Sequence, residues 1–213
     1  MSKSKHTLDL FYAPQTIIIG TSWGGLDALT QILSKLPENF SLPILIVQHR
    51  HRLSDDHFIN ILNEHSHLHV KDARDKDDLS PGIVYIAPAN YHLLLEENNT
   101  LSLSDEPLIN YSRPSINVLF ETAAEVLKEK AVGIILTGAN SDGAQGLKRV
   151  KKCGGITIVQ RPDSANAPAM PEAAIELVDV DYILTIDEIT HHLIELDQQA
   201  KKNINKKPFK RLP

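Results

Sequence analysis

Short runs of apolar and β-branched residues alternate along the chain with segments in which apolar residues recur at helical spacing. The runs predict strands at 16–19, 43–47, 83–87, 132–136, 156–160 and 182–184. The helical spacing predicts helices at 26–36, 54–65, 114–127, 143–152, 171–178 and 187–199. Such alternation is typical of an α/β protein with a doubly wound, mostly parallel sheet that carries helices on both faces.

The middle of the chain departs from this alternation. Residues 91–95 and 101–103 flank a polar segment at 96–100, and this pattern predicts a β-hairpin. We therefore expect a single domain in which a β-hairpin is inserted into the α/β pattern.

The two ends of the chain differ from the predicted domain. We assign residues 1–15 to an N-terminal lead-in, residues 16–199 to the domain, and residues 200–213 to a basic C-terminal tail. The tail holds six basic residues and no acidic one from Lys201 onward. It is interpreted either as a solvated, disordered segment or as a docking segment for an acidic partner.

Composition narrows the classes of protein. Lys and Arg number 22 and Asp and Glu number 27, so the formal net charge is −5, which argues against general nucleic-acid binding. The single cysteine, Cys153, excludes an internal disulfide framework and fits a reducing compartment. The chain has no apolar run of about 18 residues, and Asp9 and Pro14 interrupt its first apolar stretch. We expect a cytoplasmic protein without membrane insertion.

Reactive side chains follow three of the predicted strands. Residues 20–24 read Gly-Thr-Ser-Trp-Gly between a strand and a helix, which matches the G-x-S-x-G pattern of a nucleophile elbow with Ser22 at its centre. His49 follows the strand at 43–47, and Asp142 lies in a glycine-bounded turn after the strand at 132–136. Because parallel strands end at one edge of a sheet, we expect these side chains to form a Ser-His-Asp triad.

Each residue alone has an ordinary explanation. Ser22 could be a helix cap, His49 a histidine at the rim of the sheet, and Asp142 the N-cap of the helix that follows it. The coincidence of all three at strand ends favours the triad. The chain order Ser, His, Asp differs from that of the α/β-hydrolases, Ser, Asp/Glu, His, so that fold is not a good match.

Cofactor and metal sites fit the sequence less well. The glycines of the first turn do not form G-x-G-x-x-G, and no acidic residue ends the second strand, which disfavours a dinucleotide site. His65, His67 and His69 alternate, but no cysteine or well-placed carboxylate completes a metal site. We expect neither a cofactor nor a metal.

Several separated motifs carry a resemblance to a known family. They are, in chain order, 19–25 (IGTSWGG), 47–49 (VQH), 85–88 (YIAP), 113–115 (RPS), 133–138 (GIILTG), 141–144 (SDGA) and 170–175 (MPEAAI). Together they make the chain resemble the catalytic domain of the chemotaxis protein-glutamate methylesterases of the CheB type, from about Thr16 to Ile189.

This resemblance implies a function and roles for named residues. It implies hydrolysis of glutamate γ-methyl esters on the cytoplasmic helices of chemoreceptors, and deamidation of particular receptor glutamines, without a cofactor. Ser22 would be the nucleophile, His49 the base and Asp142 its orienting carboxylate. The backbone N–H groups of Trp23 and Ala139 would hold the oxyanion, and Thr21 would border the same pocket.

The sequence departs from the family at three points. Trp23 stands where family members usually carry a small residue, and Ala139 stands where methionine is common. Only about fifteen residues precede the first strand, whereas the family enzyme usually begins with a phosphoacceptor receiver domain. We therefore expect no receiver domain and activity without phosphorylation.

Two other functions remain open at this stage. Trp23 could reshape the pocket for another small ester or amide, or the chain could be a catalytically idle adaptor that binds receptor helices. The sequence does not identify the cognate receptor or the oligomeric state.

Overall fold

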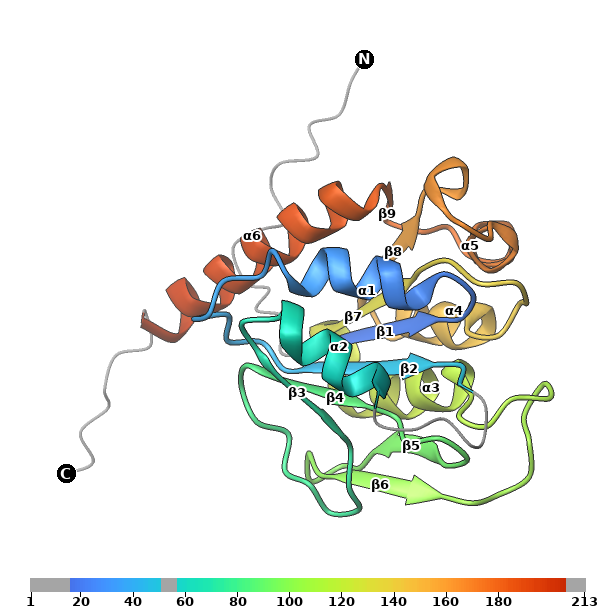
Figure 1. The fold of residues 1–213 in the computed structure, drawn as a ribbon, viewed down its shortest axis with the longest axis horizontal. Helices are drawn as coiled ribbons and strands as arrows, with labels where there is room; N and C mark the ends of the chain where they lie inside the picture. The colour runs from blue at the N-terminus through green and yellow to red at the C-terminus, as the bar shows by residue number, and fades with distance from the viewer. Residues whose placement is uncertain (1–15, 51–56, 206–213) are drawn as a thin grey trace.

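A computed structural model of the chain describes residues 16–50 and 57–205. The predicted lead-in at 1–15 lies outside the described residues, as does the tail from residue 206 onward. Seven parallel strands form one sheet in the order β3-β4-β2-β1-β7-β8-β9 (Figure 1). The strands are β1 (Thr16–Thr21), β2 (Ile44–Gln48), β3 (His69–Asp72), β4 (Ile83–Ile86), β7 (Ala131–Ile135), β8 (Ile156–Gln160) and β9 (Tyr182–Leu184).

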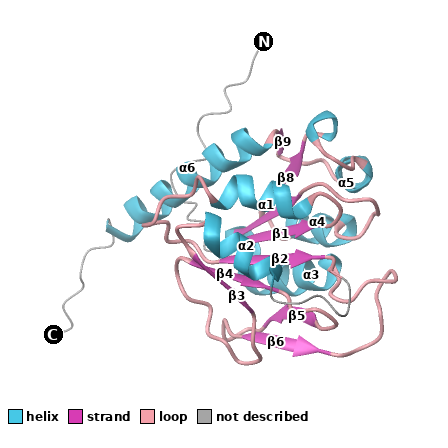
Figure 2. Ribbon diagram, viewed as in Figure 1, coloured by secondary structure: helices cyan, strands magenta, loops and turns pink. Residues whose placement is uncertain are grey.

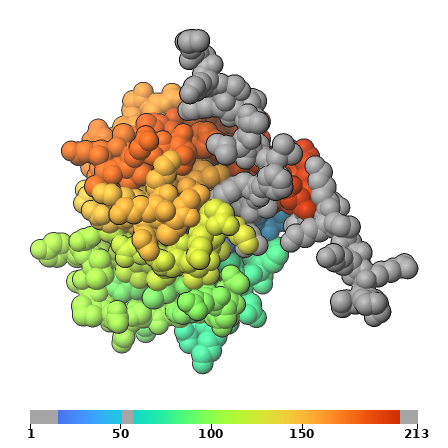
Figure 3. Space-filling view, turned by 180° about the vertical axis from the view of Figure 1, so that it is seen from behind, coloured from blue at the N-terminus to red at the C-terminus, as the bar shows by residue number. Residues whose placement is uncertain are grey.

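Helices cover both faces of this sheet (Figure 2). On one face lie α1 (Gly25–Leu33), α2 (His57–His65) and α6 (Ile186–Asn205), and on the other lie α3 (Ile116–Leu127), α4 (Ala144–Lys152) and α5 (Ala169–Leu177). Figure 3 shows the second face from outside. The predicted α/β class is therefore confirmed.

The central strand shows why the sheet has two cores. Ile17 and Ile19 pack in the hydrophobic cluster on the α1 side, and Ile18 packs in the cluster on the α3 side. All six residues of β1 are buried. A strand buried on both faces reads as a continuous apolar run, and this is how the sequence predicted it.

The predicted hairpin forms a sheet of its own. Strands β5 (His92–Leu95) and β6 (Leu101–Ser104) pair antiparallel, with Leu95 opposite Leu101. The backbone N–H of Leu95 donates to Thr122 Oγ1 of α3 at 3.3 Å, so the hairpin is joined to the helix on the second face.

Two features differ from the sequence prediction, and a third lies where the structure is not described. Strand β3 was not predicted, because its residues 69–72 are mostly polar and only Val70 is fully buried. Helix α3 begins at Ile116 rather than at Pro114. The capping residue expected at Ser54 lies outside the described residues.

Helix α6 extends to Asn205, into the segment assigned to the tail. Its Asp197 carboxylate accepts hydrogen bonds from the backbone N–H of Ser41 at 2.8 Å and from Lys201 Nζ at 2.6 Å. Ala200 is buried against the core as well. These contacts stabilise the last turns of the helix, which the basic composition alone did not predict. None of the helices in the described segments combines the length and the hydropathy needed to cross a membrane.

Candidate active site

Three adjacent strands deliver the predicted triad residues to one edge of the sheet. Ser22 follows β1, His49 follows β2 and Asp142 follows β7, and β1 lies between the other two strands. Thr21 is paired with Gln48 in the parallel register, so Ser22 and His49 are the next residues along each strand. The three residues therefore lie at the same edge of the sheet, where His49 contacts Asp142 and Ser22 lines the same groove as His49.

Backbone hydrogen bonds fix the turn that carries Ser22. Its N–H donates to the Thr137 carbonyl at 3.0 Å, and its carbonyl accepts from Gly25 N at 3.0 Å and from Gln48 Nε2 at 2.8 Å. Gly24 has a φ of 79°, in the left-handed region that glycine adopts without strain. None of these bonds uses the Ser22 hydroxyl, so the turn leaves this group available.

Gly25 permits the close approach of Gln48. A Cβ atom at position 25 would lie 2.0 Å from Gln48 Oε1, which is far inside van der Waals contact. The glycine therefore lets the Gln48 amide reach the Ser22 carbonyl and tie the ends of β1 and β2 together.

The His49 imidazole is bound to Asp142. His49 Nε2 lies 2.9 Å from Asp142 Oδ2, and Nδ1 lies 3.2 Å from Asn140 Nδ2. The described residues include no hydrogen bond between the Ser22 hydroxyl and His49. Because a carboxylate can only accept, Nε2 carries the proton in this bond, and Nδ1 is the nitrogen left to act as a base.

Asp142 is held at the N-terminus of a helix, but not of the helix that follows it. Its carboxylate accepts from Ile116 N at 2.7 Å and Asn117 N at 3.2 Å, the first amides of α3, and from Ser115 Oγ at 2.9 Å. The alternative interpretation of Asp142 as a cap of the following helix, α4, is wrong, since the N-cap residue is Gly143 and the Gly146 N–H in the first turn of α4 donates to Asn117 Oδ1 at 2.8 Å. The same carboxylate binds His49 and stabilises the start of α3.

This environment sets the charge of Asp142. Burial opposes ionisation, but hydrogen bonds from His49, the Ile116 amide and Ser115 outweigh it and hold the pKa of Asp142 below its usual range. The carboxylate is therefore ionised at neutral pH and keeps the proton of His49 on Nε2.

The lowered pKa predicts acid-sensitive stability. The unfolded chain protonates Asp142 near its ordinary value of 3.8, before the folded chain does, so this contribution is present above about pH 4 and is lost as the pH falls further. We expect the melting temperature of the wild type to fall more between pH 6 and pH 3 than that of Asp142→Asn. Equal falls in both proteins would show that the Asp142 carboxylate does not contribute.

Two backbone amides of the described residues lie beside Ser22 in the groove without a hydrogen-bond acceptor. The N–H groups of Trp23 and Ala139 have no hydrogen-bond acceptor among the described residues. Both residues line the groove that also contains Ser22 and His49. Thr21, in contrast, is fully buried beneath the site, where its hydroxyl donates to the Thr137 carbonyl at 2.9 Å.

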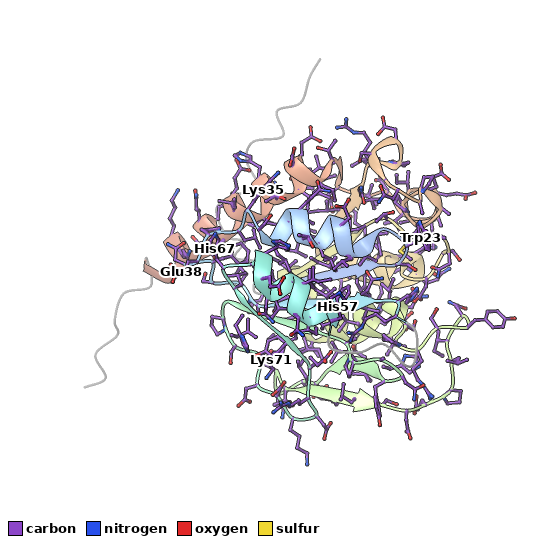
Figure 4. The ribbon with its side chains drawn as sticks, viewed as in Figure 1. Trp23, Lys35, Glu38, His57, His67 and Lys71 are labelled. Carbon is purple, nitrogen blue, oxygen red and sulfur yellow. The ribbon has the colours of Figure 1, made fainter. Side chains whose placement is uncertain are left out.

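The groove runs from Ser22 and His49 along the gap between α1 and α2. Leu26, Phe58 and Ile61 give it an apolar floor, and His57 and His65 lie along α2. Trp23 is 72% exposed at the edge of the groove. Figure 4 shows Trp23 at the end of the molecule where β1 and β2 terminate, with His57 at the start of α2.

The histidines that suggested a metal site do not form one in the described part of the chain. His65 ends α2 and His69 begins β3, and no three His, Cys, Asp or Glu side chains of the described residues are grouped to hold an ion.

Sequence reasoning gave no role to two residues of the site. Ser115 belongs to the 113–115 motif, and Asn140 lies in the turn after β7, but neither had an assigned contact. The feature of the sequence that pointed to them as site residues was a polar side chain in an otherwise apolar or glycine-rich segment.

Comparison with known proteins identifies the family of this chain. The family model described as CheB methylesterase matches residues 17–193. The chain belongs to the CheB methylesterase family. A CheB relative from Leptospira interrogans is 49% identical over 184 residues, which are 86% of this chain and 95% of the relative.

Other CheB proteins support the same assignment. The protein-glutamate methylesterase/protein-glutamine glutaminase of Clostridium acetobutylicum is 34% identical over 85% of this chain and 53% of its own length. The crystal structure of the Thermotoga maritima CheB methylesterase catalytic domain matches with a TM-score of 0.82 and 36% identity, over 86% of this chain and 99% of that one. The predicted resemblance and fold are thus confirmed.

Proposed function

We propose that this chain hydrolyses glutamate γ-methyl esters on the cytoplasmic helices of chemoreceptors, with Ser22 as nucleophile, His49 as base and Asp142 as the carboxylate that orients the base. The observation that carries the proposal is the 2.9 Å contact between His49 Nε2 and Asp142 at the strand edge that also presents Ser22. Membership of the CheB methylesterase family supports the choice of substrate.

The first chemical step is acyl transfer to the enzyme. Ser22 Oγ attacks the ester carbonyl carbon while its proton moves to Nδ1 of His49, which Asp142 leaves unprotonated. The carbon–oxygen bond to the methoxy group then breaks, and the proton on Nδ1 passes to the departing oxygen to give methanol. Water, activated by the same nitrogen, hydrolyses the acyl-serine to release the glutamate carboxylate.

The nitrogen that faces the carboxylate differs from that in the serine proteases. In the serine proteases, Nδ1 faces the carboxylate and Nε2 faces the serine. Here Nε2 faces Asp142, so Nδ1 must serve Ser22. The imidazole has the same two functions in the opposite orientation.

The free amides of Trp23 and Ala139 supply the oxyanion site in this proposal. Charge develops on the ester oxygen only as the tetrahedral intermediate forms, so donors held at that position stabilise the transition state more than the substrate. The N-terminus of α1, which begins at Gly25, adds a favourable dipole beside Ser22.

The same site would deamidate glutamine side chains. The attack on the carbonyl is identical, and the carbon–nitrogen bond then breaks while the proton on Nδ1 passes to the departing NH₂ group, which leaves as ammonia. The Clostridium acetobutylicum relative is named a protein-glutamine glutaminase as well as a protein-glutamate methylesterase, which supports this second reaction.

Methanol release tests the proposed function. The purified chain should release methanol from a methylated chemoreceptor cytoplasmic fragment, and the same fragment without methylation should yield none. Failure to release methanol from the receptor, combined with hydrolysis of p-nitrophenyl acetate, would favour a hydrolase for another small ester. Absence of both reactions would favour the adaptor.

Trp23→Thr should change substrate preference more than chemistry. The indole is exposed on the groove and its backbone, not its side chain, faces the oxyanion in this proposal. We expect kcat/KM for methylated receptor to change by roughly tenfold, the effect of losing one apolar contact, while that for a p-nitrophenyl ester changes less. Equal changes for both substrates would exclude a role of Trp23 in specificity.

A further inference from the structure

Asn140 contacts Nδ1 of His49, the nitrogen that accepts the proton of Ser22 in the proposed reaction. Its Nδ2 lies 3.2 Å from His49 Nδ1, and its Oδ1 accepts from the backbone N–H of Asp142 at 3.0 Å. Asn140 thus contacts both the base and the residue that orients the base, although it lies on the exposed side of the site.

The second contact fixes the orientation of the Asn140 amide. A backbone N–H can only donate, so the oxygen of the amide must face Asp142 and the NH₂ group must face His49. The NH₂ group can only donate, so it is directed at the lone pair of Nδ1. Together with Nε2–H on Asp142, these bonds define a neutral imidazole whose basic nitrogen is already hydrogen-bonded.

We propose that Asn140 is a positioning residue that covers the basic nitrogen of His49 in the resting enzyme and must release it before Ser22 can transfer its proton. Nδ1 has one lone pair, so the amide of Asn140 and the hydroxyl of Ser22 compete for it. The inference rests on the proposed function, because it concerns the base of the same reaction.

The change in rate expected on removal of the Asn140 amide can be estimated from the strengths of the hydrogen bonds to His49. Asp142 holds the imidazole by a charge-assisted bond, which is stronger than the neutral bond from Asn140, so the tautomer survives without Asn140. Loss of a neutral hydrogen bond at an exposed site corresponds to about a two- to tenfold change in rate. Removing the amide should therefore accelerate proton transfer from Ser22 by this factor.

Two substitutions separate competition from structural support. Asn140→Ala removes the amide and frees Nδ1, so the rate should rise by about two- to tenfold. Asn140→Asp keeps an acceptor for the Asp142 N–H but places a carboxylate on Nδ1, where it favours a proton on that nitrogen. This variant should react more slowly than the wild type at pH 7, and the acidic limb of its pH–rate profile should move to higher pH.

Ser141→Ala is the matched control. Ser141 is the exposed neighbour of Asn140 in the same turn, and its hydroxyl makes no hydrogen bond with the described residues. Among the described residues, the ionisable groups near His49 are Asp142 and Arg50, and Asp27, His57 and His65 line the same groove. These groups are present in all the variants, so a difference between the pH–rate profiles of the wild type and an Asn140 variant is caused by the residue at position 140.

The measurement is the rate at which a fluorophosphonate labels Ser22, recorded from pH 5 to pH 9 in the wild type and the three variants. Faster labelling in Asn140→Ala, an acidic limb at higher pH in Asn140→Asp and no change in Ser141→Ala are expected. If Asn140→Ala labels no faster than the wild type, or if Asn140→Asp keeps the wild-type profile, the inference is wrong. A wild type that is labelled on another residue, or not at all, would instead overturn the proposed function.

Discussion

Ser22→Ala should abolish methanol release while the fold persists. The hydroxyl is the proposed nucleophile, and loss of the nucleophile costs about 10⁶-fold in kcat in subtilisin, a hydrolase with an analogous triad. The turn itself depends on the backbone of Ser22 and on Gln48, and alanine leaves these bonds in place. The measurement is methanol release from methylated receptor, together with a thermal melt of the same preparation.

The thermal melt distinguishes a loss of methanol release caused by lost chemistry from one caused by unfolding. A variant that melts within a few degrees of the wild type and releases no methanol has lost chemistry and not structure. Methanol release by Ser22→Ala at more than about one hundredth of the wild-type rate would remove Ser22 from the mechanism. His49→Ala should be about as damaging, and the double variant hardly worse, since triad residues act as a unit.

Asp142→Asn should lower turnover by about 10⁴-fold, the loss recorded for the same substitution in a serine protease. The asparagine NH₂ group cannot accept the proton of Nε2. Where it faces His49, the imidazole changes tautomer, so that Nδ1 carries the proton and cannot take one from Ser22. The expected loss is therefore in kcat, measured by methanol release at saturating receptor.

The same substitution should also destabilise the domain. Both carboxylate oxygens accept hydrogen bonds, from His49 and Ile116 on one and from Ser115 and Asn117 on the other. An amide leaves a buried donor of α3 without an acceptor, which costs about 1–3 kcal/mol.

Ser115→Ala is the control for this effect. It removes one donor to Asp142 and leaves the His49 contact intact, so turnover should fall by less than tenfold. An Asp142→Asn enzyme within tenfold of the wild type would show that Asp142 does not set the tautomer.

The sequence predicted the edge of the sheet where the site lies, and there is a physical reason. Strands β1, β2 and β7 are buried on both faces, so their apolar runs are continuous and their ends are sharp. Ser22 and His49 each follow such a run directly, and Asp142 follows in the next turn. Parallel pairing then brings the three ends together.

The individual hydrogen bonds that hold Asp142 and orient His49 were not predictable from the sequence. Asp142 caps a helix that begins 26 residues earlier, at Ile116, and no local pattern signals this pairing. The orientation of His49 depends on Asp142 and Asn140, which lie more than ninety residues away. Edge strand β3 was missed because edge positions tolerate polar residues, which removes the apolar run that identifies a strand.

Fluorophosphonate modification tests the central claim most directly, because it reports the reacting atom and the activity in one sample. The enzyme is labelled to increasing extent, the adduct is located by peptide mass spectrometry, and methanol release from methylated receptor is measured at each point. The account predicts one adduct, on Ser22, with activity lost in proportion to labelling. An adduct on another residue, or methanol release by enzyme whose Ser22 is fully modified, would contradict it.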